Sequence, residues 1–343
     1  MSIQGIAKLA PGPGHVGLLE APEPEVSAGH AIVEVAAAGL CGTDMHIYHD
    51  EYPSRPPVIL GHEVAGVVVE TGAGVTSCRS GDRVTVEPYF HLCGRCDYCR
   101  AGLPNMCPER LSIGSGVHGA FSRYVLVRGQ SVHRLPGNVD VRSGALTEPL
   151  ACCVHALEMS RVEPSDVVVV SGPGAIGLLM MQVVKAAGAT VLLVGTTADA
   201  ARMEVGRQLG ADVILDVQAG DPWDVISART DGRGPDVVFE CSGAAASARN
   251  CLQWVRRRGR YVQVGLFSQP IQWDQNQTCY KEVQMSGSFA TVPSSWGKAL
   301  RLLENGQVQT APLITHTWAL AEWQAAFDTF ERREGLKNVF LPG

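Results

Sequence analysis

The sequence predicts an α/β protein of two domains, one rich in β-strands and one built on a doubly wound parallel sheet. Three observations support this prediction. At 343 residues the chain is longer than one ordinary domain. Residues 1–150 contain short apolar segments broken by glycine and proline, as in a β-rich domain. After residue 150, β-branched runs alternate with helical patterns, which is typical of a parallel sheet.

The expected elements follow the apolar pattern of each segment. Strands are expected at 31–36, 64–70, 83–88, 167–171, 191–194, 236–240, 260–264 and 338–341, and helices at 176–187, 200–209, 295–304 and 321–330. The run at 167–171 is apolar at nearly every position, as in a strand buried on both faces. Gly210 follows the helix at 200–209, where a terminating glycine is expected.

Composition and charge exclude several functional classes. The net charge of −6 opposes non-specific nucleic-acid binding, and we interpret the short basic run at 256–260 as a solvated helix end before a strand. Apolar runs stop well short of the ~18 residues of a membrane span. Eleven cysteines without a signal-peptide pattern favour a reducing compartment. We therefore expect a cytoplasmic protein with neither nucleic-acid nor membrane partners.

Four closely spaced cysteines form the most specific pattern in the chain. They are Cys93, Cys96, Cys99 and Cys107. Four thiolates at this spacing can surround one zinc ion tetrahedrally and leave no open position for chemistry. The spacing therefore predicts a structural zinc lobe at about residues 90–110.

A glycine-rich loop follows the first buried strand of the expected parallel sheet. Its residues are Gly172, Pro173, Gly174, Ala175, Ile176 and Gly177, in the pattern G-x-G-x-x-G. Between a strand and a helix, this pattern permits a tight turn and a close approach of the backbone to a pyrophosphate. We predict a dinucleotide-binding loop. Cys241 and Val264 stand at the ends of two further strands, so we predict that they also contact the cofactor.

The sequence after the second strand bears on the choice between NAD and NADP. No carboxylate follows the strand directly, and Gly195, Thr196 and Thr197 occupy the place where a ribose-binding acid is usual. These small residues could accept a 2′-phosphate, with Arg202 nearby in sequence. Alternatively, Asp199 could reach the ribose hydroxyls from a longer loop. Both cofactors stay open at this point.

A second set of metal-ligand residues lies upstream of the four cysteines. Cys41, Thr43 and His46 form one group, His62 and Glu63 form another, and Glu148 lies just before the nucleotide-binding segment. A catalytic zinc takes about three protein ligands and keeps one position for water or substrate. Cys41, His62 and one carboxylate would supply such a set.

These motifs together resemble the zinc-dependent medium-chain alcohol dehydrogenase family. The matching features, in the family's order, are Cys41-Gly42-Thr43-Asp44, Gly61-His62-Glu63, the four-cysteine lobe, Glu148-Pro149-Leu150 and the glycine loop. Glutamate before Pro-Leu is similar to the polyol and threonine dehydrogenase branch. The resemblance covers essentially the whole chain.

The resemblance implies a role for each matching residue. Cys41 and His62 would ligate a catalytic zinc, and Glu63 and Glu148 would ligate it directly, through water or in exchange. The zinc, as a Lewis acid, would lower the pKa of an alcohol hydroxyl. Thr43 would pass the proton towards His46, because an ordinary histidine pKa of about 6.5 suits that task. Hydride would go to the nicotinamide of NAD or NADP.

The resemblance also implies the architecture. A GroES-like β-barrel catalytic domain would use residues 1–150 and 290–343, and a Rossmann domain would use residues 151–289. Two zinc ions per chain, one catalytic and one structural, are expected. Relatives are often tetramers, so a homo-oligomer is expected.

Substrate identity is less constrained by the sequence. Sorbitol dehydrogenases carry Arg-Tyr shortly after the Gly-x-Phe of a late strand, whereas this chain reads Gly287-Ser288-Phe289-Ala290-Thr291. We therefore expect a neutral secondary alcohol, a polyol or the corresponding ketone. Two other readings stay in view: a zinc-free quinone or enoyl reductase of the same superfamily, and a non-enzymatic scaffold of the same fold.

Overall fold

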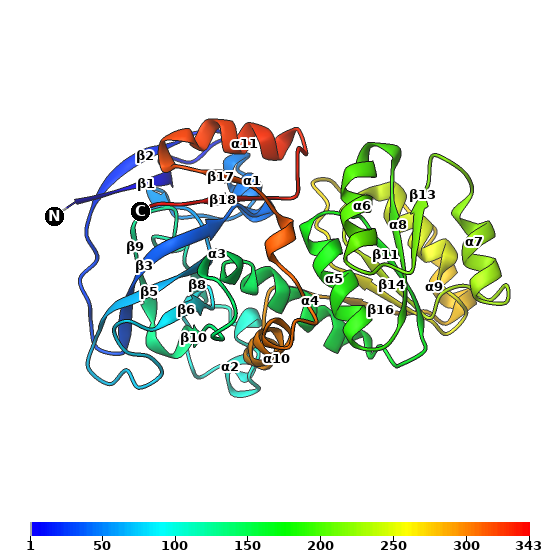
Figure 1. Cartoon of the computed structure of the whole chain (residues 1–343), viewed down its shortest axis with the longest axis horizontal. Coiled ribbons are helices and arrows are strands. Elements are labelled where there is room, and N and C mark those ends of the chain that lie inside the picture. The colour runs from blue at the N-terminus through cyan, green and yellow to red at the C-terminus, as the bar shows by residue number, and fades with distance from the viewer. Residues whose placement is uncertain (1) are drawn as a thin grey trace. The chain divides into compact units, whose positions relative to one another are not determined.

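The computed structural model describes residues 2–343, which divide into two compact units (Figure 1). The first unit comprises the chain up to Pro149 together with Thr291–Leu300 and Thr310–Gly343, and the second comprises Leu150–Ala290 and Arg301–Gln309. We had expected 301–309 in the first domain. This segment lies in the second unit, where the side chain of Gln182 bonds both the N–H and the C=O of Gln309, at 2.7 and 3.2 Å.

The strands of the first unit form three sheets, of three, seven and two strands. Its strands are β1 (Ser2–Lys8), β2 (Val16–Pro22), β3 (His30–Gly39), β4 (Val58–Ile59), β5 (Glu63–Thr71), β6 (Arg83–Val86), β7 (Tyr89–His91), β8 (Leu111–Ser112), β9 (Tyr124–Arg128), β10 (Val132–Arg134), β17 (Ile314–Trp318) and β18 (Lys337–Phe340). Its helices are α1 (Gly42–Tyr48), α2 (Asp97–Arg100), α3 (Val141–Gly144) and α11 (Trp323–Glu331). Ile6, Val33 and Phe121 belong to one fully buried apolar cluster, which stabilises the sheets by removing apolar surface from water.

The strand order of the first unit brings distant residues together. The larger sheet runs β10-β6-β5-β3-β18-β17, with β9 also paired to β3. Because β3 lies between β5 and β18, its final residue Gly39 pairs with both Glu63 and Val339. The start of β5 and the start of β18 therefore lie on either side of the chain segment that leads into Cys41.

The second unit is a parallel six-stranded sheet flanked by helices. Its strands are β11 (Val167–Ser171), β12 (Thr190–Gly195), β13 (Val213–Asp216), β14 (Val237–Glu240), β15 (Arg260–Gln263) and β16 (Gln284–Gly287). Its helices are α5 (Ala175–Ala186), α6 (Ala200–Gln208), α7 (Pro222–Arg229), α8 (Ala245–Trp254) and α9 (Asn276–Lys281); α4 (Thr147–Ser160) and α10 (Pro293–Glu304) contain residues of both units. In Figure 1, α5 and α6 flank the sheet on one side and α8 on the other.

The order of the parallel sheet defines where a ligand can bind. The strands run β13-β12-β11-β14-β15-β16. Successive strands are added on one side of β11 as far as β13 and on its other side from β14, so the strand order reverses between β11 and β14. In open parallel sheets, ligands bind beyond the carboxyl ends of the strands at this reversal. The predicted glycine loop follows β11 and thus lies at that point.

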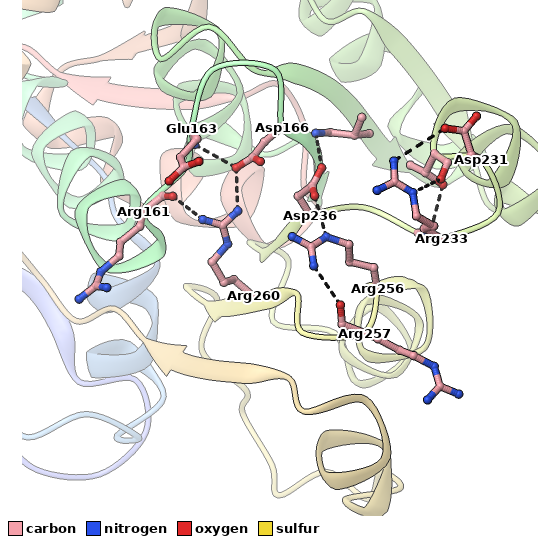
Figure 2. A network of polar contacts seen from close by, with 12 residues as sticks. Arg161, Glu163, Asp166, Asp231, Arg233, Asp236, Arg256, Arg257 and Arg260 are labelled. Carbon is pink, nitrogen blue, oxygen red and sulfur yellow. Dashed lines mark hydrogen bonds and ion pairs between the residues drawn. The ribbon is translucent and has the colours of Figure 1, made fainter.

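The basic run at 256–260 lies between the end of α8 and the start of β15. Arg256 pairs with Asp236 at 2.6 Å and Arg260 with Asp166 at 2.7 Å, and both pairs can be followed in Figure 2. These ion pairs hold the amino-terminal edge of the sheet, which agrees with a helix end before a strand. Across residues 2–343, none of the helices combines the length and the apolar character needed to cross a membrane.

Candidate active site

Three predicted ligands form one cluster in the first unit. Ligand atoms of Cys41, His62 and Glu63 lie within 4.8 Å of one another. Cys41 precedes α1, and His62 and Glu63 stand at the entry to β5. Oε2 of Glu63 is buried and has no hydrogen-bond partner among the described residues. An unsatisfied carboxylate oxygen beside a thiol and an imidazole is a donor set that fits zinc, because a metal would satisfy that oxygen.

The fourth predicted ligand, Glu148, stands outside this cluster. It lies in the first turn of α4 and its side chain is buried. Its charge still reaches the site, because it contributes to a raised pKa of His62. Burial alone would lower the pKa of His62 in the metal-free protein, but the charges of Cys41, Asp44 and Glu148 outweigh burial.

A buried lysine stabilises the other oxygen of Glu63. Lys337 Nζ lies 2.5 Å from Glu63 Oε1, and both side chains are buried. Burial opposes the charge of Lys337, yet Glu63 and Cys41 raise its pKa above the ordinary value. Lys337 was not predicted, because 274 positions separate it from Glu63 and no local motif marks it.

A second buried acid links Cys41 to the segment that carries His62. Asp44 accepts hydrogen bonds from the N–H of Cys41 at 2.9 Å and from the N–H of Gly61 at 3.3 Å. Its Oδ1 also lies 3.8 Å from Nδ1 of His62. Burial raises the pKa of Asp44. Outer carboxylates of this kind orient metal-binding histidines. The sequence motif contained Asp44, but its link to His62 depends on the fold.

The predicted proton relay is only partly assembled in the structure. The thiol of Cys41 donates to Oγ1 of Thr43 at 3.8 Å, which places the Thr43 hydroxyl beside the three candidate ligands. His46 lies in the last turn of α1, and its Nδ1 is 2.7 Å from Oε2 of Glu51. Glu51 was not predicted. It fixes the orientation of the His46 ring, whose side chain is about one-quarter exposed at 26%.

The four cysteines of the lobe converge as predicted from their spacing. Sγ of Cys93 lies 3.9 Å from Sγ of Cys99 and 3.7 Å from Sγ of Cys107. A zinc–sulfur distance of about 2.3 Å gives a tetrahedral edge of about 3.8 Å, so these separations fit a zinc ion. The backbone N–H groups of Arg95 and Cys96 lower the pKa of Cys93 to about 6, which favours the thiolate that binds metal.

A serine at Cys99 tests the structural role of the lobe. We expect the C99S variant to keep one zinc per chain and most of its turnover, while its thermal midpoint falls by about 5 °C or more, because a lost structural metal removes folding energy. Metal analysis and calorimetry measure both effects. C279S, at an exposed cysteine, is the control and should change neither. Loss of turnover in C99S at unchanged stability would contradict a structural role.

The glycine loop forms an open cradle at the end of β11. Gly172 has a φ of +103°, and a Cβ on Gly174 would meet no atom within 4 Å. A Cβ on Gly177 would meet the carbonyl oxygen of Gly172 at 1.8 Å, so only glycine allows this close packing. Pro173, Ala175 and Ile176 complete the turn into α5. The open space over Gly174 at a helix N-terminus fits a pyrophosphate.

The carboxylate of Asp199 forms its contacts within the turn that follows β12. Oδ2 of Asp199 accepts from the N–H and the hydroxyl of Thr196, at 3.1 and 2.7 Å. Oδ1 of Asp199 faces Arg202 at 3.6 Å. Both carboxylate oxygens are therefore engaged within the turn, and β12 ends at Gly195.

The two remaining predicted contacts lie at the carboxyl edge of the same sheet. Cys241 follows β14, and burial raises the pKa of its thiol, so it is a poor nucleophile. Val264 follows β15, and its N–H donates to the carbonyl of Glu240 at 2.9 Å. Both residues belong to the edge at which a dinucleotide is expected.

Two family models match the chain. The alcohol dehydrogenase GroES-like domain matches residues 27–137, and the zinc-binding dehydrogenase model matches residues 175–305. A sorbitol dehydrogenase of Halalkalibacterium halodurans is 41% identical over 341 residues, covering 99% of each chain. The chain belongs to the zinc-binding dehydrogenase family. The family and fold predicted from the sequence are thereby confirmed.

Further relatives of this dehydrogenase lie in the same branch. A D-arabitol-phosphate dehydrogenase of Enterococcus avium is 39% identical, covering 95% of this chain and 94% of the relative. A Sinorhizobium meliloti structure, described as a zinc-binding dehydrogenase bound to NADP, is 31% identical with a TM-score of 0.91 and covers 100% of both chains. The protein is therefore an NAD(P)-linked, zinc-dependent oxidoreductase.

Proposed function

We propose that this dehydrogenase oxidises a neutral secondary alcohol or polyol to the ketone, with Cys41, His62 and Glu63 holding the catalytic zinc. The unsatisfied, buried Oε2 of Glu63 inside this cluster carries the proposal. Glu148 would complete the site as a fourth or exchanging ligand. Cys93, Cys96, Cys99 and Cys107 would hold a second, structural zinc.

The mechanism assigns separate tasks to the residues of the site. A bound zinc would act as a Lewis acid on the substrate oxygen and lower the pKa of the hydroxyl. Thr43 would accept the hydroxyl proton and at the same time release its own proton towards His46, since the Thr43 hydroxyl lies beside Cys41. His46, oriented by Glu51, would take that proton towards solvent, because its side chain is partly exposed. Hydride would pass to the nicotinamide.

A substrate screen tests the proposed reaction. Purified protein should reduce NAD or NADP with at least one member of a panel of secondary alcohols, diols, polyols and phosphorylated polyols. The phosphorylated compounds belong in the panel because one relative is named for such a substrate. No turnover across the panel, in protein that binds the coenzyme, would contradict the proposal.

We propose that the coenzyme site accepts NADP. The residues that would contact the coenzyme include the glycine loop, Gly195, Thr196, Thr197, Arg202, Cys241 and Val264. Asp199 is engaged within its own turn. Asp216 accepts hydrogen bonds from the hydroxyl of Thr197 at 2.7 Å and from the N–H of Gln218 at 2.8 Å, so each oxygen of both acids already has a partner. Arg202 would then supply the charge that a 2′-phosphate requires.

Alanine at Arg202 tests this coenzyme assignment. The R202A variant should raise KM for NADP by about ten-fold and leave KM for NAD within about two-fold, because only the 2′-phosphate uses the guanidinium. Steady-state kinetics with both coenzymes at a fixed alcohol concentration measure the two values. Equal changes in both KM values would show that Arg202 only supports the turn.

We propose a cytoplasmic homo-oligomer that pairs through the edge of the parallel sheet. β16 is an edge strand, and Tyr280, in the helix α9 that precedes it in the chain, is 71% exposed. An uncovered edge with apolar side chains favours pairing with a second copy. No disulfide joins any of the eleven cysteines, all of which lie within residues 2–343, and this suits a reducing compartment. Light scattering should give the mass of at least two chains; a monomer at micromolar concentration would contradict the assembly.

A further inference from the structure

A carboxylate is buried at the carboxyl end of β14, and it has no salt bridge to any residue within 2–343. Glu240 is the last residue of that strand and its side chain is fully buried. It accepts hydrogen bonds from the N–H groups of Ser242 and Gly243 at 2.9 and 3.0 Å, from the hydroxyl of Ser247 at 2.8 Å and from Nε2 of Gln263 at 2.7 Å. The hydroxyl of Ser242 also donates to it.

All of these partners are neutral groups. Both oxygens of Glu240 only accept hydrogen bonds, as an ionised carboxylate does. Backbone amides, hydroxyls and a carboxamide solvate its charge without cancelling it. In a buried site of low dielectric, an uncancelled charge acts over a longer distance than it would in water.

The position of Glu240 places this charge at the coenzyme edge. β14 is the strand next to β11, where the winding of the sheet reverses. The Ser247 hydroxyl that donates to Glu240 also lies 2.7 Å from the hydroxyl of Ser171, the last residue before the glycine loop. The glycine loop belongs to the first mononucleotide-binding half of such a sheet, so the half that begins with β14 takes the nicotinamide nucleotide.

We propose that the negative charge of Glu240 favours the oxidised, cationic nicotinamide over the reduced, neutral one. This inference rests on the proposed coenzyme site. The two forms of the coenzyme share the same phosphates and differ by one positive charge on the ring. Any effect of Glu240 on the phosphates therefore cancels in the ratio of the two dissociation constants, and an effect on the ring does not.

The E240Q variant tests the charge. Dissociation constants for the oxidised and reduced coenzyme are measured by calorimetry on the zinc-loaded protein. The ratio of the oxidised to the reduced constant should rise about five-fold in E240Q, as expected for a charge acting across several ångströms of protein. A ratio equal to that of the wild type would overturn the proposal and leave Glu240 as a purely structural residue.

Two control variants separate charge from structure. S247A removes one hydrogen bond to Glu240 and keeps the charge, so its ratio should stay at the wild-type value. D236N removes the same charge about 13 Å away at the other end of the strand, where Asp236 pairs with Arg256 (Figure 2), and should also leave the ratio unchanged. A shifted ratio in either control would contradict a local effect of Glu240.

A second charge variant keeps the test independent of the folding of E240Q. Q263K would place a cation against Glu240 Oε2 in place of the Gln263 carboxamide, and should raise the ratio in the same direction. An unchanged ratio in a folded Q263K protein would overturn the proposal. If the proposed coenzyme site were wrong, the result would be different, because the wild-type protein would then bind neither the oxidised nor the reduced coenzyme.

Discussion

Replacement of Cys41 by alanine should lower the turnover of this dehydrogenase by about a thousand-fold or more and reduce its zinc content from two ions to one. A catalytic zinc held by about three protein ligands loses much of its affinity when one ligand is removed. Electrostatic and Lewis-acid stabilisation of the developing alkoxide is then lost, and such terms dominate the rate of hydride transfer from an alcohol. Steady-state kinetics and metal analysis on the same sample measure both effects.

The C99S variant is the reciprocal control for C41A. It removes a thiolate from the other zinc site, so it should lose one zinc and stability but keep its turnover. Normal activity in C41A would contradict the assignment of the catalytic site. If no substrate for the wild type is found and C41A binds the coenzyme as the wild type does, the chain would be better explained as a binding protein built on this fold.

Methionine at Lys337 should lower the free energy of unfolding by about 3–5 kcal/mol. The substitution keeps most of the volume of the side chain but leaves Glu63 with a buried charge and no cationic hydrogen-bond partner, and breaking a buried pair from one side has costs of this order. Urea unfolding of the wild type and of K337M measures the difference, on protein from which mild chelation has removed any zinc at Glu63, because a bound zinc would itself offset that charge.

Two variants control for effects other than the lost ion pair. K185M removes a lysine from the partly exposed pair with Asp212 and should cost about 1 kcal/mol or less. The double variant K337M/E63Q removes both charges and should recover a large part of the loss. If K337M costs no more than K185M, the ion pair between Lys337 and Glu63 has no special stabilising role.

Local sequence patterns predicted the parts of the fold that depend on near neighbours. The run Val167–Ser171 is a strand at its predicted bounds, because a β-branched run between turns has few alternatives. The glycine loop was predictable because each of its three glycines has a local role. One permits the tight turn, one lets the backbone approach the pyrophosphate, and one lets the helix pack closely on the strand. β16 was not predicted because it is exposed and contains a single apolar residue, Met285. β13 was also not predicted, although its apolar run at 213–215 could have indicated a strand.

The residues that support the candidate metal ligands could not be predicted from local patterns. Cys41, His62 and Glu63 were predicted, but Lys337 reaches Glu63 only because β3 lies between β5 and β18. The orientation of His46 depends on Glu51, which has no motif of its own. For the same reason 301–309 was placed in the wrong compact unit, because its link to Gln182 joins positions far apart in the sequence.

The zinc content of the wild-type protein tests the central claim most directly. Native mass spectrometry of protein purified without chelators should show two zinc ions per chain, and mild chelation should remove one of them together with the dehydrogenase activity. A single zinc, or activity that survives removal of the second ion, would mean that Cys41, His62 and Glu63 do not form the catalytic metal site.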